Sequence, residues 1–205
     1  MTALQQVFLQ DWGEGAKMRM QNTDVYFPAL EKGPYRHQLI PSEGFYIEET
    51  FSALIRNSQE KIMIGTPYFI PGKRVFEDLQ DALKRGVKLE ILVPNKADHP
   101  FVKEASYKYL RRLIQLGATV FQYKKGFYHA KTLIVDDTVC DIGTANFDKR
   151  SFYLNHEFNC YTYHQTYIDQ VKDLIKKDQN QAIIAQMEDL KSPIEPIARL
   201  LSPLL

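Results

Sequence analysis

Between residues 45 and 126, apolar segments alternate with longer amphipathic ones, and this alternation restricts the possible folds more than any other feature of the sequence. Apolar spacing predicts helices over residues 47–58, 74–86 and 99–117, and apolar runs predict strands over residues 61–70, 87–94 and 118–123. Strands that alternate with helices of this length are joined by right-handed crossovers and run in parallel. The sequence therefore predicts an α/β fold whose largely parallel sheet is covered by helices on both faces.

The pattern changes after Gly126, where apolar segments follow one another more closely. Strands are predicted over residues 129–137, 138–145 and 156–164, with a hairpin turn at Asp136 and Asp137, and a helix is predicted over residues 167–177. Near the N-terminus, residues 3–12 have the spacing of a short amphipathic helix. Residues 13–44 are polar and weakly periodic, which indicates a connector or an irregular edge.

Composition excludes several classes of protein. Hydrophobic residues make up 44% of the chain and charged residues 25%, which is typical of a globular domain rather than a disordered chain. The net charge of +1 and the pI near 7.7 do not favour a dedicated nucleic-acid binder. No apolar run approaches the ~18 residues of a membrane span, so we expect a soluble chain or one peripheral to a membrane.

One segment carries residues of the kinds that perform phosphate chemistry. His129, Lys131 and Asp136 form the pattern H-x-K-x4-D, and a Gly-Thr-x-Asn sequence that contains Thr144 and Asn146 follows it. Positions i and i+2 of a strand point to the same face, so the imidazole of His129 and the ammonium of Lys131 are expected side by side.

This pair suits a phosphate group. Lys131 would neutralise the non-bridging oxygens while His129 attacks phosphorus or passes a proton. Asn146 could donate a hydrogen bond to the same oxygens. Glu157 is the best candidate for a carboxylate that orients the imidazole.

The motif identifies the chain as resembling the phospholipase D superfamily, whose hallmark is H-x-K-x4-D followed by G-[ST]-x-N. The resemblance is closer to the C-terminal half of bacterial cardiolipin synthases, and it is carried by TPYFIP, LVPNKADHPFV, GFYHAKTLIVDD, IGTANFDKRSFYLNHEFN and RLLSPLL. The segment ALQQVFLQDW is similar to the end of that family's N-terminal half. We therefore expect a phospholipase D-like domain over residues 45–205, with a mixed, mostly parallel sheet between helices, preceded by a helix and connector over residues 1–44.

The resemblance implies an activity and a set of roles. Such enzymes transfer a phosphatidyl group between two phosphatidylglycerols through a phosphohistidine, without a metal or other cofactor. His129 would be the nucleophile or general acid and Glu157 its orienting residue. Asp136 belongs to the motif, but its position in a hairpin favours a structural role over proton transfer. The expected substrate-binding residues are Lys131, Thr144, Asn146 and Ser151.

One departure from the family affects the mechanism. Enzymes of this kind carry two H-x-K-x4-D motifs, and here His37, His99, His156 and His164 do not begin a second one. A histidine bonded to phosphorus cannot also protonate the leaving alkoxide, so a second motif-bearing half is needed. It would come from a second copy of the chain or from a separate N-terminal half. The chain thus resembles the second half of a synthase, and we expect residues 3–12 to pack loosely without their partner.

Two alternatives remain open: a homodimeric single-motif phosphodiesterase acting as a phospholipase or nuclease, and a catalytically incomplete fragment that binds membranes. The implied partner is an anionic phospholipid, namely phosphatidylglycerol, and not nucleic acid. The implied location is the cytoplasmic side of a bacterial cell membrane, to which this chain would be peripheral.

Four residues near the predicted site have two interpretations each. Tyr68 and Phe69 end a predicted strand at the edge where ligands collect, and aromatic packing and substrate contact are both consistent with the pattern. Asp98 follows the next strand, where a helix-capping role is slightly favoured over headgroup recognition. Arg150 follows the motif and fits either a phosphate-binding role or a structural turn.

Overall fold

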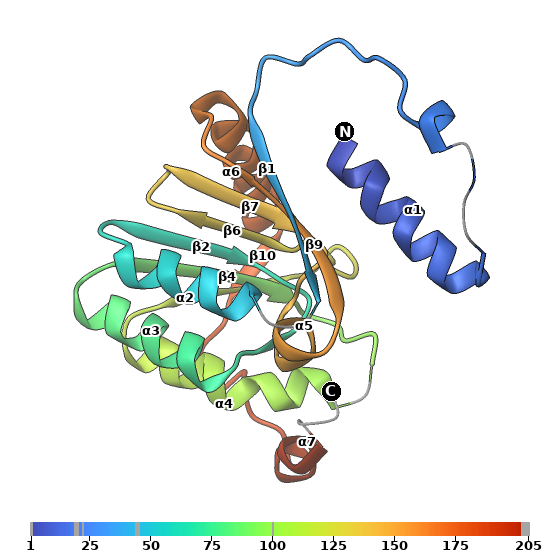
Figure 1. Cartoon of the computed structure of the whole chain (residues 1–205). Helices are drawn as coiled ribbons and strands as arrows, with labels where there is room; N and C mark the ends of the chain where they lie inside the picture. The colour runs from blue at the N-terminus through green and yellow to red at the C-terminus, as the bar shows by residue number, and fades with distance from the viewer. Residues whose placement is uncertain (1, 19–20, 22, 44–45, 100, 202–205) are drawn as a thin grey trace.

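The computed structural model describes the chain except for residues 1, 19–20, 22, 44–45, 100 and 202–205. An eight-stranded sheet, in the order β1-β9-β7-β6-β2-β4-β5-β10, forms the centre of the molecule (Figure 1). Its strands are β1 (His37–Glu43), β2 (Lys61–Gly65), β4 (Lys88–Pro94), β5 (Thr119–Tyr123), β6 (Thr132–Val135), β7 (Val139–Gly143), β9 (His156–Thr162) and β10 (Ala182–Ile184). A separate pair of short strands, β3 (Phe69–Ile70) and β8 (Phe147–Asp148), runs in parallel.

Helices cover both faces of this sheet. They are α2 (Ile47–Asn57), α3 (Lys73–Lys84), α4 (Val102–Gln115) and α6 (Gln165–Gln179). The short helices α5 (Lys149–Tyr153) and α7 (Glu195–Leu201) pack on α2 and α4, respectively. One hydrophobic core lies between the sheet and α2, α3 and α4, and a second lies between the sheet and α6. The expected sandwich of a mixed sheet between helices is confirmed.

The proportion of parallel pairs is smaller than expected. β2 pairs in parallel with β4, and β4 with β5, as the alternation of strands and helices predicts. The remaining pairs of the large sheet are antiparallel, among them the hairpin of β6 and β7 and the two edge pairs β1 with β9 and β10 with β5. The sheet is therefore mixed but not mostly parallel.

Two segments differ locally from the sequence-based expectation. Residues 37–43, expected in a connector or irregular edge, form the edge strand β1 and pair with β9 along their whole length. Pro41 lies within this strand, and an edge position tolerates its missing N–H. The predicted strand over residues 61–70 is divided into β2 and β3, with Pro67 between them.

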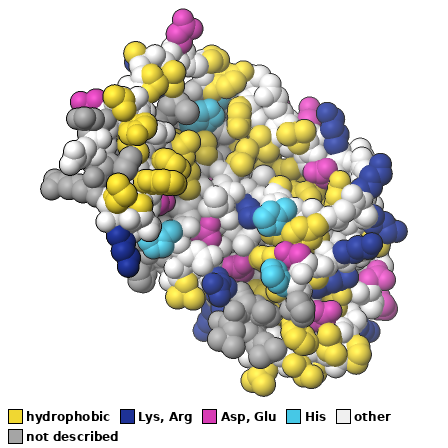
Figure 2. Space-filling view, turned by 90° about the vertical axis from the view of Figure 1, so that its right-hand side faces the viewer, with side chains coloured by type: hydrophobic (Ala, Val, Ile, Leu, Met, Phe, Trp, Pro, Cys, Tyr) yellow, Lys and Arg dark blue, Asp and Glu magenta, His cyan; other side chains and the backbone are white. Residues whose placement is uncertain are grey.

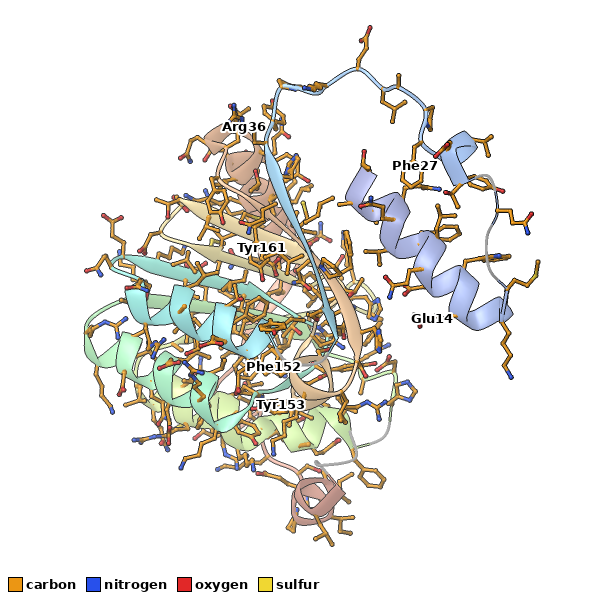
Figure 3. All side chains as sticks on the ribbon, viewed as in Figure 1. Glu14, Phe27, Arg36, Phe152, Tyr153 and Tyr161 are labelled. Carbon is orange, nitrogen blue, oxygen red and sulfur yellow. The ribbon has the colours of Figure 1, made fainter. Side chains whose placement is uncertain are left out.

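Helix α1 (Thr2–Ala16) lies at the periphery of the domain, where it contacts the edge strand β1, and a long connector that includes the 3₁₀ helix η1 (Thr23–Tyr26) joins the two (Figure 1). Leu9 is the buried residue of α1, whereas Phe8 and Trp12 are 54% and 56% exposed. In Figure 3, Phe152 and Tyr161 lie within the body of the protein, while Glu14 lies on this separate helix. The high exposure of these two rings agrees with the expectation that residues 3–12 pack loosely, which stays a prediction.

A candidate active site at one edge of the sheet

The topology brings several distant segments to one edge of the sheet. Gly65, at the end of β2, lies opposite Leu92 of β4 and Thr132 at the start of β6. Gly143, at the end of β7, lies opposite Asn159 of β9. The residues after β2, β4 and β7 and those before β6 therefore share one edge. Figure 2 looks onto this side of the molecule, where histidine, basic and acidic side chains gather.

His129 and Lys131 precede β6 in an extended segment, since the strand begins at Thr132 and not at residue 129. They nevertheless lie together, because Lys131 Nζ donates a hydrogen bond of 2.8 Å to the backbone carbonyl of His129. Burial and the Lys131 ammonium lower the pKa of His129 below its ordinary value of 6.5, while Asp98 acts in the opposite direction. The lowered pKa favours the neutral form of this exposed imidazole, which has the lone pair of a nucleophile.

Glu157 is buried at the start of β9, and neighbouring polar groups hold both of its oxygens. The Thr144 hydroxyl donates to Oε2, and Asn155 Nδ2 donates to Oε1 at 3.2 Å. Within the described part of the chain, no hydrogen bond joins Glu157 to His129, so the structure does not bear out the expected orienting contact. The carboxylate instead stabilises the ammonium of Lys131. Burial lowers the pKa of Lys131, and the negative charge of Glu157 acts to raise it.

Thr144 is a positioning residue in this arrangement. Its hydroxyl donates to Glu157 and accepts a bond of 2.9 Å from the backbone N–H of Phe158. The hydroxyl proton of Thr144 is already used in the bond to Glu157, so it is not free for a bond to phosphate. The geometry therefore does not favour the predicted substrate-binding role of Thr144.

Asn146 is held by a cluster around the start of α5. The Ser151 hydroxyl accepts a bond of 3.0 Å from Asn146 N, and Asp148 caps the helix by accepting from Ser151 N at 2.8 Å. The Asn146 side chain acts to lower the pKa of the nearby Asp148 carboxyl, against the effect of burial. The role of the Asn146 amide as a donor to a phosphate oxygen stays a prediction.

Ser151 itself is fully buried, which corrects its assignment as a substrate-binding residue. A side chain without exposed surface cannot contact a phosphate, and its bonds hold the backbone of Asn146 instead. Arg150, the neighbouring residue with two interpretations, is exposed.

Replacing Ser151 with alanine is expected to lower the free energy of unfolding by about 1–2 kcal/mol, because the Asn146 N–H loses its acceptor in a buried position. Urea denaturation followed by circular dichroism measures this change. Ser192→Ala is the control, since that hydroxyl makes a bond of 3.4 Å in an exposed segment. Equal losses in the two variants would contradict the positioning role.

The structure does not bring Asp136 to this cluster. It follows β6 at the opposite end of the strand, in a hairpin turn where it and Asp137 have φ values of 51° and 53°. Its carboxylate accepts hydrogen bonds from the backbone N–H groups of Gln59, Glu60 and Lys61 at 2.7–2.9 Å. Burial acts to raise the pKa of this carboxyl, but the three N–H groups lower it below its ordinary value. These contacts favour the structural role over proton transfer.

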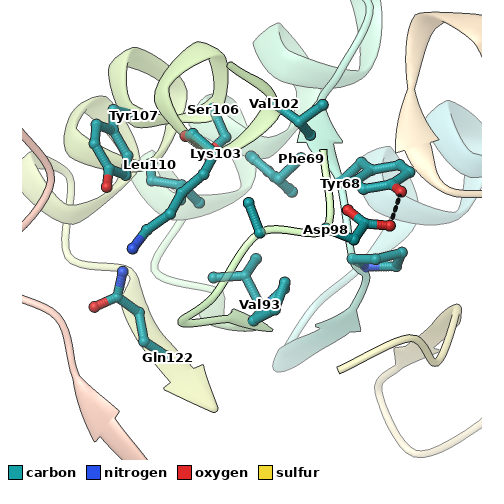
Figure 4. Close-up of a pocket in the computed structure, with 13 residues that line it drawn as sticks. Tyr68, Phe69, Val93, Asp98, Val102, Lys103, Ser106, Tyr107, Leu110 and Gln122 are labelled. Carbon is teal, nitrogen blue, oxygen red and sulfur yellow. Dashed lines mark hydrogen bonds between the residues drawn. The ribbon is translucent and has the colours of Figure 1, made fainter. Parts of the chain in front are cut away.

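Tyr68 and Asp98 lie on the same edge as His129. The Tyr68 hydroxyl donates a bond of 2.6 Å to Asp98 Oδ2, and the pair forms one end of a pocket whose other walls include Val102, Lys103 and Gln122 (Figure 4). Phe69, in contrast, is buried and stacks on Phe147 with ring centroids 6.0 Å apart. Aromatic packing is thus the role of Phe69, whereas Tyr68 points toward the site.

Sequence reasoning missed Thr66 and Asp148. The Thr66 hydroxyl donates to the Tyr68 carbonyl and accepts from Phe147 N, and so it joins the segment after β2 to the segment that carries Asn146. The aspartate before Lys-Arg-Ser was a recognisable helix cap in the sequence, but Thr66 gave no such signal. In the described part of the chain, no three His, Cys, Asp or Glu side chains are grouped as metal ligands would be.

Solved structures with this architecture define the class of protein. The phospholipase D family member Nuc from Salmonella typhimurium matches with a TM-score of 0.64 and 18% identity, over 74% of this chain and 98% of that one. Phosphatidylserine synthase from Haemophilus influenzae matches with a TM-score of 0.68 and 17% identity, over 82% of this chain and 45% of that one. The fold is that of a phospholipase D-like domain.

Sequence comparison gives the family. Residues 51–179 match the family model described as cardiolipin synthase, PLD-like domain, and the chain belongs to this family. The minor cardiolipin synthase ClsB of Bacillus subtilis is 36% identical over 97% of this chain and 51% of its own length. The major cardiolipin synthase ClsA of the same organism is 36% identical over 99% of this chain and 45% of its own length. The chain therefore spans about half the length of these relatives.

Proposed function

We propose that this chain carries one half of a phosphatidyl-transfer site that makes cardiolipin from two phosphatidylglycerols. The observation that carries the proposal is the meeting of His129, Lys131 and Asn146 at one sheet edge, in a member of the cardiolipin synthase family. A neutral imidazole, an ammonium and an amide N–H are together what a phosphodiester needs: a nucleophile, a positive charge and a neutral donor.

In the first step, an imidazole nitrogen of His129 attacks phosphorus and the bond from phosphorus to the headgroup glycerol breaks. The departing alkoxide takes a proton from an acid on the second half of the site, and glycerol leaves. In the second step, that group takes the proton back from a hydroxyl of a second phosphatidylglycerol, whose oxygen attacks phosphorus. The bond to His129 breaks, and cardiolipin and the unmodified histidine result.

The second half of the site comes, in this proposal, from a second copy of the chain or from a separate half with its own H-x-K-x4-D motif. The reason is chemical, since His129 is covalently occupied when the leaving group needs its proton. The lipid substrate also implies work at a membrane surface, which for the implied location is the cytoplasmic face of a bacterial membrane. No helix in the described part of the chain is long and apolar enough to cross a bilayer.

The test combines the mass of the chain in solution with a product assay. Light scattering after gel filtration, over a range of concentrations, distinguishes monomer from dimer. Vesicles of phosphatidylglycerol are then incubated either with the chain alone or with the chain together with the N-terminal half of Bacillus subtilis ClsB. The lipids are identified by mass spectrometry. We expect cardiolipin and free glycerol wherever two motif-bearing halves are together.

Two outcomes would contradict this function. Phosphatidic acid without cardiolipin would show water as the acceptor and would favour the single-motif phosphodiesterase. Vesicle binding without any product, with both halves present, would favour a membrane-binding fragment. Salt-sensitive binding of DNA would revive the nuclease alternative, against which the net charge of +1 argues.

A further inference from the structure

Asp98 does not have the capping role that its position suggests. Helix α4 begins after Phe101, whose φ is 70°, and no side chain of the described residues caps this helix end. The Asp98 carboxylate instead accepts the Tyr68 hydroxyl through Oδ2 at 2.6 Å. The contact joins residues that follow two neighbouring parallel strands, β2 and β4.

This carboxylate lies at the same edge of the sheet as the phosphate-binding groups. The ends of β2 and β4 share their edge of the sheet with the start of β6, and His129 and Lys131 directly precede that start. Asp98 is close enough for its charge to act on both side chains. Its side chain is 31% exposed, and Oδ1 makes no hydrogen bond to any residue that the structure describes.

A negative charge at this place does not serve to bind phosphate, because it repels the phosphate oxygens. A carboxylate accepts hydrogen bonds, so it suits a donor group of the substrate. In a phosphodiester, such a donor close to the phosphate belongs to the headgroup. Tyr68 fixes the direction of the free oxygen, and burial together with the bond to Asp98 raises the pKa of Tyr68, so that its hydroxyl remains a donor. The carboxylate is thus oriented before a ligand arrives, which reduces the entropy lost on binding.

A hydroxyl group fits as the headgroup donor to Asp98 better than an ammonium group does. The charges of Lys131 and Asp98 act on one another, and His99 Nε2 lies 4.0 Å from Asp98 Oδ2. The Lys131 ammonium disfavours a second ammonium at the same place and leaves a neutral hydroxyl unaffected. We propose that Asp98, held by Tyr68, accepts a hydrogen bond from a hydroxyl of a glycerol headgroup and so selects polyol phosphodiesters over those with alkyl or amino headgroups. This inference rests on the proposed function, because it concerns the substrate of the same site.

Binding of water-soluble diesters tests the inference without requiring turnover. Calorimetric titration compares glycerophosphoglycerol with glycerophosphoethanol, which lacks the headgroup hydroxyls, and with glycerophosphoethanolamine. We expect the full chain to prefer the glycerol diester roughly tenfold, as one hydrogen bond to a charged group allows. Asp98→Ala should abolish the preference, and Tyr68→Phe should reduce it. Asp173→Ala, an exposed residue of α6, is the matched control and should keep it.

The outcomes separate this inference from the proposed function. Equal binding of the glycerol and ethanol diesters, a preference for the ethanolamine diester, or an unchanged preference in Asp98→Ala would overturn the role of Asp98. A preference that depends on Asp98 in a chain that never forms cardiolipin would support the headgroup site and contradict the proposed reaction. Lys131→Ala should weaken all three diesters by a similar factor, because it removes a contact to the shared phosphate.

Discussion

Replacing His129 with alanine is expected to lower the rate of phosphatidyl transfer by roughly 10³-fold or more, to a level set by binding and charge stabilisation alone. The expectation follows from the covalent step, since the variant removes the imidazole nitrogen that attacks phosphorus, and the lowered pKa of His129 favours its nucleophilic neutral form. The measurement is the rate of cardiolipin formation from phosphatidylglycerol vesicles with two motif-bearing halves present.

The control for this variant is His37→Ala. His37 is also exposed, but it lies at the far end of β1, opposite Thr162, where its ring packs on Tyr167 with centroids 5.1 Å apart. We expect this variant to retain the unaltered rate. The free energy of unfolding of His129→Ala should lie within about 0.5 kcal/mol of that of the unaltered chain, because the exposed side chain contributes little to packing. Full activity of His129→Ala would contradict the covalent mechanism.

The second large effect is on stability. Replacing Asp136 with alanine is expected to lower the free energy of unfolding by about 3–5 kcal/mol, because three backbone N–H groups at the start of β2 lose a charged acceptor at once. Loss of this contact also loosens the hairpin between β6 and β7 from the neighbouring strand. Chemical denaturation of the unaltered chain and the variant measures the difference.

The adjacent Asp137 is a matched control in the same turn. It forms a partly exposed ion pair with Lys172, and Asp137→Ala should cost about 1 kcal/mol or less. A variant of Asp136 that keeps its stability but loses activity as His129→Ala does would contradict the structural role.

The pH dependence has a defined sign. Because the folded-state pKa of Asp136 lies below its ordinary value of 3.8, its contribution is present above that value and is lost as the pH falls through the folded-state pKa. Asp136→Ala should lack this part of the acid sensitivity.

The sequence predicted the five longer helices and the main strands, because these depend on local periodicity, but it did not predict the short helix α5. The meeting of His129, Lys131 and Asn146 follows from a motif of fixed spacing and stays a prediction. It missed β1 and β10, whose residues show weak periodicity and which need partners distant in the chain. The prediction that the sheet is mostly parallel was wrong, because the direction of the strands after β5 depends on which strand each of them pairs with. The contacts of Glu157 with Thr144 and Asn155 depend on side-chain geometry and could not be read from spacing.

The separate position of α1 has a consequence for spectroscopy. Trp12 is the single tryptophan of the chain, and it lies on this helix with more than half of its side chain exposed and its ring stacked on Phe8. Tryptophan emission therefore reports the surroundings of α1. It does not report the surroundings of the core strands, which contain no tryptophan. A protein partner that covers this helix would shift the emission to shorter wavelength while the fold of the domain stayed unchanged. The chain thus contains a single intrinsic fluorophore that reports association at α1.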